Sequence, residues 1–106
     1  MGVPVLFSAL TNTVVQVRGH ACVLESYSIV NPAAATTFIQ MFDSLATPTL
    51  GTTVPTLSLG VPTIQSETLQ ADTFFQLGLW VAATTTATGN GAPATAATVN
   101  LTMSSG

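Results

Sequence analysis

The sequence contains very little charge. Of its 106 residues only 5 % are charged, with one basic and four acidic side chains and a formal net charge of −3. Typical soluble domains carry roughly 25 % charged residues. A protein that binds DNA or RNA needs clustered Lys and Arg to displace the counterions of the phosphates. We therefore expect no nucleic-acid partner.

Long apolar runs and targeting signals are lacking as well. A membrane-spanning helix needs about 20 consecutive apolar residues, and Gln76, the threonine runs and the prolines interrupt every stretch that approaches this length. The N-terminus MGVPVLFSAL has no basic region typical of a signal peptide. Leu6 occupies the position where a myristoylation motif requires Ser or Thr. We expect no membrane partner.

Reactive side chains are few. Cys22 is the single cysteine, which excludes an intrachain disulfide. It lies two residues after His20, but nucleophilic catalysis needs a third group that orients the base. The favoured interpretation is a turn at Gly19 followed by a strand with a buried, inert cysteine. The carboxylates are dispersed, and Glu67 and Asp72 are expected to flank a hairpin turn.

Binding motifs for metals and phosphates are also lacking. One His, one Cys and scattered acids do not make a recognisable zinc site. The sequence contains neither the calcium-binding loop nor the glycine-rich phosphate loop. We expect no metal, no cofactor and no enzymatic activity.

Short runs rich in Val, Ile, Phe and Thr, bounded by Gly, Pro, Asn and Asp, make up most of the chain. This pattern is typical of strands and turns. It predicts one all-β domain over residues 1–106, a β-sandwich of about eight strands and by preference a jelly roll. Residues 1–10 form an N-terminal arm or edge strand. The predicted strands are Val3–Ala9, Thr13–Arg18, Ala21–Val30, Thr36–Asp43, Val54–Leu59, Thr63–Gln70, Thr73–Ala82 and Thr98–Met103.

Two of these predicted strands are apolar on both faces, because successive side chains of a strand point to opposite sides. One is Thr36–Asp43 and the other is Phe74–Ala82. In the first strand, Ile39 and Met41 lie opposite Phe38 and Phe42. In the second, one face carries Phe75, Leu77, Leu79 and Val81, and the other carries Phe74, Gln76, Gly78 and Trp80.

A second apolar face needs a cover other than the core. A loop of the same chain or another subunit can supply it, and we favour the subunit because exposed aromatic patches usually mark interaction sites. The predicted oligomer interface is Phe38, Phe42, Phe74 and Trp80. Trp80 is also the residue on which a carbohydrate-binding alternative would rest, as a platform for a sugar ring.

The segment 83–97 has no apolar periodicity and is predicted to be a long loop, with a turn at Asn90-Gly91. Loops of this length are usually binding elements or disordered, and this one lacks the charge typical of disorder. We expect a contact loop.

The stretch from Ala21 to Leu59, with a strand that ends in Asn31, small residues, and then TTFIQMFDS with Phe42-Asp43, resembles the small jelly-roll decoration, or cement, proteins of tailed-phage heads. Gly78-Leu79-Trp80 fits their later glycine-rich strand. The resemblance rests on strand rhythm and covers most of the chain. It implies no catalytic residues.

The resemblance also implies a location and partners. Such a protein forms a homo-oligomer, commonly a trimer, on the outer surface of the virion, where it binds the major capsid protein and stabilises the head. Contact with the capsid is expected through the N-terminal segment or the loop 83–97, with Val3, Val5, Phe7, Asn90 and Pro93 as contact residues. The alternative is a tail or fibre domain that binds carbohydrate.

Overall fold

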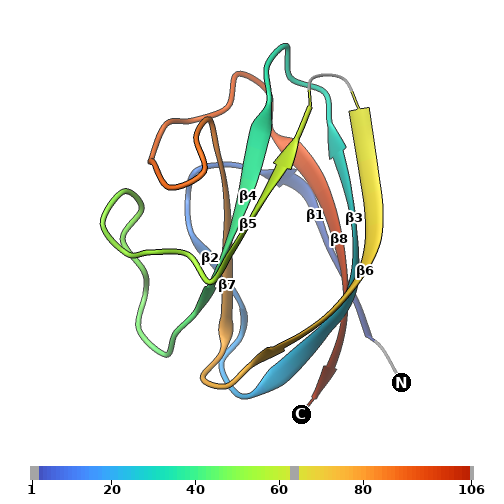
Figure 1. Ribbon diagram of the computed structural model, residues 1–106, viewed down its shortest axis with the longest axis vertical. Coiled ribbons are helices and arrows are strands. Elements are labelled where there is room, and N and C mark those ends of the chain that lie inside the picture. The colour runs from blue at the N-terminus through green and yellow to red at the C-terminus, as the bar shows by residue number, and fades with distance from the viewer. Residues whose placement is uncertain (1–2, 63–64, 106) are drawn as a thin grey trace.

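The computed structural model describes residues 3–62 and 65–105, apart from the side chains of residues 65–72 and 105. This part of the chain forms eight strands and no helix, arranged as two sheets packed face to face (Figure 1). No helix within it is therefore long and apolar enough to span a membrane. The strands are β1 (Val3–Leu10), β2 (Val15–Arg18), β3 (Cys22–Asn31), β4 (Thr37–Asp43), β5 (Leu57–Val61), β6 (Gln65–Phe75), β7 (Leu79–Thr84) and β8 (Ala97–Ser105).

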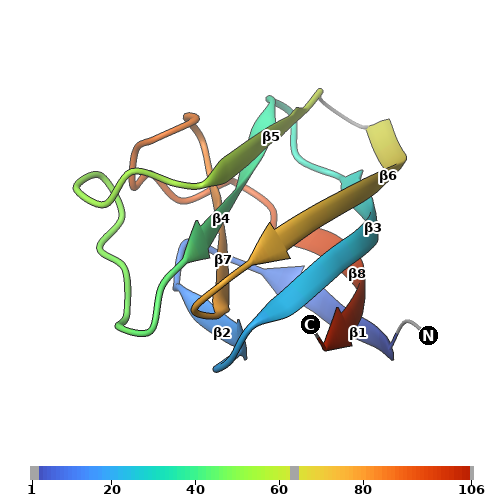
Figure 2. The same ribbon diagram turned by 60° about the horizontal axis from the view of Figure 1, so that its bottom comes forward.

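The strands are distributed evenly between the two sheets. The first, here called sheet A, has the order β1-β8-β3-β6, and the second, sheet B, has the order β2-β7-β4-β5 (Figure 2). The antiparallel pairs β1·β8, β2·β7, β3·β6 and β4·β5 are nested within one another. The chain is thus one long hairpin whose successive strand pairs alternate between the two sheets. The predicted all-β sandwich is confirmed.

The core lies between the sheets and follows the alternation of the strands. On β8, Val99, Leu101 and Met103 are buried, as the sequence pattern predicts, and on β2, Val15 and Val17 pack against the same core. Full burial of a side chain of this size stabilises the fold by roughly 1.5–3 kcal/mol. Sheets A and B are therefore held together mainly by these inward rows.

The boundary between β6 and β7 differs from the prediction. β6 runs without interruption from Gln65 to Phe75 and contains both Glu67 and Asp72, so the hairpin turn expected between them is wrong. The turn lies instead at residues 76–78, inside the predicted strand Thr73–Ala82. Leu77 belongs to this turn and is 48 % exposed, so its predicted core position is also wrong.

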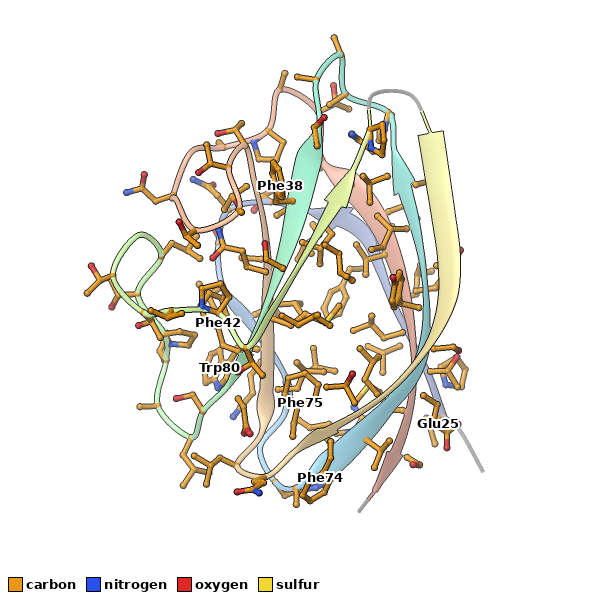
Figure 3. All side chains as sticks on the ribbon, viewed as in Figure 1. Glu25, Phe38, Phe42, Phe74, Phe75 and Trp80 are labelled. Carbon is orange, nitrogen blue, oxygen red and sulfur yellow. The ribbon has the colours of Figure 1, made fainter. Side chains whose placement is uncertain are left out.

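The misplaced turn also separates two aromatic residues that the sequence pattern places on one face. Phe74 lies on β6 in sheet A, and Trp80 lies on β7 in sheet B (Figure 3). Only Phe75, Leu79 and Val81 of the predicted inward row enter the core. The predicted second face of this segment is therefore not a single surface.

Candidate contact surfaces

Two long loops of the chain lie over the outer face of sheet B. The segment 44–56 connects β4 to β5, and the segment 85–96 connects β7 to β8 (Figure 1). Beneath them Phe42 is 1 % exposed, and Gln40, Ala82 and Thr84 are completely buried. The second apolar face of β4 is covered by its own chain.

Gln40 fastens the loop 85–96 to the sheet. Its Nε2 group donates to Thr84 Oγ1 at 2.7 Å, to Gly89 O at 3.0 Å and to Thr86 O at 3.4 Å. Thr86 O and Gly89 O are carbonyl oxygens, which can only accept, so the NH₂ end of the Gln40 amide must point towards the loop. Among the described residues Gln40 Oε1 finds no partner. Hydrogen bonds are stronger in a buried, low-dielectric site than in water. The bonds from Gln40 therefore hold the loop 85–96 at Thr86 and Gly89, which lie 46 and 49 residues further along the chain.

The loop 44–56 is held at both of its ends and at its tip. Trp80 Nε1 donates to Ser44 O at 3.0 Å, and the Thr56 amide donates to Met41 O at 2.8 Å. At the tip Gly51 has φ of 82°, a left-handed conformation that glycine adopts without strain. A Cβ on Gly51 would lie 3.7 Å from the side chain of Asn90, so the tips of the two loops are neighbours.

The four residues of the predicted oligomer interface fall into different environments (Figure 3). Phe42 is buried by its own loops, which corrects the expectation that another chain covers it. Phe38 is partly buried, and its ring lies over Gly60 on the neighbouring strand, 2.8 Å from where a Cβ would stand. Of the four, Phe74 alone is more than half exposed, at 51 %.

Trp80 is partly buried, and its indole N–H is engaged within the chain by Ser44 O. A sugar-binding platform presents the open face of an aromatic ring to solvent. The position of Trp80 therefore does not favour the carbohydrate-binding alternative.

The predicted capsid-contact residues do not gather in one place. Val3, 54 % exposed, begins β1, and Val5 and Phe7 are half-buried against the core. Asn90 and Pro93 belong to the loop 85–96, which is tied beyond the other end of β1 by a bond from Asn12 Nδ2 to Asn90 O at 3.1 Å. At about 3.3 Å per strand residue, Val3 is separated from this loop by most of the length of β1, and Phe7 by about half of it.

Asp43 holds the turn between β6 and β7. Its carboxylate accepts hydrogen bonds from the amides of Gln76 at 3.0 Å, Leu77 at 2.8 Å and Gly78 at 3.4 Å. Partial desolvation acts to raise the pKa of Asp43, but the three amides stabilise the charged form and hold the pKa below its ordinary value. The backbone must come close here, since a Cβ on Gly78 would lie 2.7 Å from Arg18 O.

Three large apolar side chains are exposed around this turn, and we call them the apolar rim. They are Leu45, 64 % exposed, Phe74, 51 % exposed, and Leu77, 48 % exposed. Leu45 follows Ser44, whose carbonyl oxygen lies 3.0 Å from where a Cβ of Gly78 would stand. The sequence pattern placed Leu77 in the core because it continues the alternating row of Phe75, Leu79 and Val81. It missed Leu45 because that residue belongs to no alternating run.

The reactive side chains His20 and Cys22 are kept apart. His20 is exposed, and its Nδ1 donates to Ala21 O at 2.9 Å. Cys22 is fully buried, and its burial raises the pKa of the thiol, with opposing effects from Arg18, which lowers it, and Asp43, which raises it. A buried thiol with a raised pKa is a poor nucleophile. The expected burial of Cys22 is confirmed.

A pocket of about 280 Å³ lies between residues 33–37, which end at the first residue of β4, and the loop 85–96. Asn31 shapes its wall: Nδ2 donates to Val61 O at 2.9 Å and Ala35 O at 3.0 Å, and Oδ1 accepts from Thr37 Oγ1 at 3.0 Å. The lining consists of Ala, Thr and Pro side chains, without an ionisable group. Within the described part of the chain, no three His, Cys, Asp or Glu residues gather as metal ligands.

Comparisons with known proteins leave the function to be argued from these surfaces. No family model matches the chain, and no curated protein or solved structure shows significant similarity to it. The features that stand out are the loop-covered face of sheet B and the apolar rim.

Proposed function

We propose that this protein is a structural virion component that decorates the outer surface of a phage head, self-associates and binds the major capsid protein. We also assign its nested strand order to the jelly roll, the eight-stranded double sheet found in viral capsid domains. The sequence resemblance described above points to the same class.

The apolar rim is the observation that carries this proposal. Large apolar side chains are exposed at one end of the sandwich, at Leu45, Phe74 and Leu77. The chain has few charged residues, and charge is what normally keeps such a surface from associating with other proteins. Exposed apolar patches mark interaction sites. Hydrogen bonds to the Asp43 carboxylate hold the turn that presents Leu77, so docking costs little conformational entropy.

A shell lattice is a suitable partner for a small contact of this kind. A protein that binds only the assembled shell shifts the equilibrium towards assembly. Copies linked to one another engage several lattice points at high effective concentration, which raises the avidity without a larger interface. A rigid β-sandwich with three exposed anchors fits this role.

The internal arrangement of polar groups supports a structural rather than a catalytic role. Asn31 and Gln40 are fully buried, and their hydrogen bonds hold loops in place. His20 and Cys22 do not face one another, since one is exposed and the other buried.

Binding to purified heads of the phage that encodes the chain tests the proposal. Heads are sedimented with wild-type protein, with Leu77→Asp and with the control Val54→Asp, whose side chain is 81 % exposed on the loop 44–56. We expect wild type and the control to cosediment and Leu77→Asp to lose binding at least about tenfold, because it places a charge in a desolvated contact. Absence of the chain from virions, or its location in the tail, would refute head decoration.

A further inference from the structure

The strand β1 is an open edge of sheet A with unusual chemistry. Each sheet has two edges, and of the four edge strands β2 contains Arg18, β6 contains Glu67 and Asp72, and β5 has five residues. β1 has eight residues and no charged one. Free edges are normally protected by charge, because their unpaired backbone groups can pair with another chain. β1 is the longest edge without that protection.

The side chains of β1 are apolar on both faces and incompletely covered. Leu6, at the middle of the strand, points away from the core and is 60 % exposed. Val5 and Phe7 point inward and pack against the core, but they remain partly exposed at the open side of the sandwich. A further strand beside β1 would cover all three.

We propose that two copies of this chain pair through β1, antiparallel and around a two-fold axis at Leu6, so that their sheets A become one continuous eight-stranded sheet. In this register Leu6 faces Leu6 of the partner subunit on the outer side. On the inner side Val5 faces Phe7 of the partner subunit, and Phe7 faces the partner's Val5. Directly opposed apolar pairs stabilise an antiparallel sheet.

The backbone is compatible with this register. A proline in a sheet lies on an edge strand with its missing N–H directed away from the neighbouring strand. Pro4 pairs with Thr102 of β8, which indicates that Pro4 and Leu6 direct their backbone groups outward. Beyond Phe7 the register with β8 shifts, and Ser8 O accepts from Thr98 Oγ1 of β8 at 3.2 Å, so it is bonded within its own chain and needs no donor from Pro4 of the partner subunit. The missing donor and the occupied acceptor coincide.

The lack of charge makes β1 the edge at which a second copy meets the least repulsion. Each copy carries a net charge of −3, so two copies already repel one another, and a contact without charged side chains adds nothing to that repulsion. Pairing through β6 would bring four carboxylates to one edge, whereas pairing through β1 brings none. An edge contact of this kind buries less than about 1,200 Å², which is typical of weak, reversible association.

The inference deepens the self-association step of the proposed function and rests on it. Attachment to the shell uses the apolar rim, which belongs to other residues and is measured separately with phage heads. A chain that dimerises but does not bind heads would refute the decoration role and leave the β1 contact standing.

Light scattering during size-exclusion chromatography, from about 10 to 300 µM, tests the contact. We expect wild type to move from monomer to dimer mass over this range and Leu6→Lys and Leu6→Glu each to remain monomeric. The control Val54→Lys should dimerise as wild type does. An equimolar mixture of Leu6→Lys and Leu6→Glu should recover the dimer, because a two-fold axis at this residue places the opposite charges side by side.

A second measurement does not depend on any variant. Hydrogen exchange of the Leu6 amide in wild type should slow as the concentration rises, because this amide is bonded across the two-fold register. A wild type that stays monomeric throughout, a Leu6→Lys variant that dimerises as wild type does, or a charge mixture that stays monomeric would each overturn the proposal.

Discussion

The outer faces of the two sheets differ, because one is covered by loops and the other is open to solvent. Sheet B buries Phe42 and Gln40 under its own loops, so its outer face is a second, smaller core (Figure 3). The outer face of sheet A is uncovered, and its central strand β8 presents Thr98, Asn100 and Thr102 there. Glu25 is displayed on the same open side.

The difference shows that a strand with two apolar faces does not by itself indicate a subunit interface. The chain has loops of 13 and 12 residues over sheet B, and they supply the cover from within. Among the described side chains, large apolar groups are left exposed at the apolar rim, along β1, and singly at Val30 and Val54. The apolar rim and β1 are therefore the first places to look for a partner.

The difference between the two outer faces is tested most strongly by removing a buried side chain from the covered face of sheet B. Phe42→Ala removes a ring that is 1 % exposed, and we expect the free energy of unfolding to fall by about 3–5 kcal/mol in chemical denaturation. The matched variant Phe74→Ala on sheet A, at a side chain 51 % exposed, should lower it by less than about 1 kcal/mol. Similar losses for the two variants would contradict the difference between the faces.

The junction between the sheets comes next. Gly78→Ala places a Cβ 2.7 Å from Arg18 O and 3.0 Å from Ser44 O, both backbone atoms that cannot move independently. We expect a loss of about 2–3 kcal/mol in the free energy of unfolding. In Gly19→Ala the nearest group is the side-chain Nε2 of Gln16 at 3.3 Å, which can rotate away, so this control should remain close to wild type.

The attachment of the loop 85–96 can be loosened without changing the volume of the core. Gln40→Met keeps the length of the side chain but removes the donor to Thr84 Oγ1, Thr86 O and Gly89 O. We expect a loss of about 2 kcal/mol and faster hydrogen exchange in residues 85–91. Asn100→Ala on the open face should change neither quantity, and unaltered exchange in Gln40→Met would show that the loop is held by other contacts.

The smallest effect on the free energy of unfolding is expected where Asp43 holds the β6–β7 turn, and it depends on pH. Because the folded pKa is lowered, the stabilisation is present above the unfolded pKa of about 4 and is lost as the pH falls through the folded value. Asp43→Asn should cost on the order of 1 kcal/mol at pH 7 after solvent screening, and its loss should shrink towards zero in acid. Denaturation of both proteins between pH 7 and pH 2 measures this, and a pH-independent difference would contradict it.

Much of the fold could be predicted from local pattern. The strands at both ends of the chain and the alternation of Val99, Leu101 and Met103 agree with the structure, because an inward row depends only on which neighbours share a face. The cysteine prediction is confirmed for a similar reason, since the strand that contains Cys22 has a clear inward row. The β6–β7 boundary was missed because the turn is stabilised by Asp43, 33 residues from Gln76.

The contact surfaces were less accessible to the sequence. Leu45, Phe74 and Leu77 come from two different connections and one strand end, and no spacing joins them. The burial of Phe42 within its own chain could not be predicted, because the sequence does not show which loops lie over sheet B. Leu6 drew attention in the sequence only as a departure from a myristoylation motif, and its significance depends on the position of β1 at the edge of a sheet.

The sequence by itself determined the class of fold, since period-two alternation and turn residues act between near neighbours and need no knowledge of the rest of the chain. It also determined that few charges are available to protect the surface. Tertiary structure alone decided which apolar faces are sealed and which are left open. Bonds such as Gln40 to Gly89, which span 49 residues, are formed only when the two sheets have closed on one another.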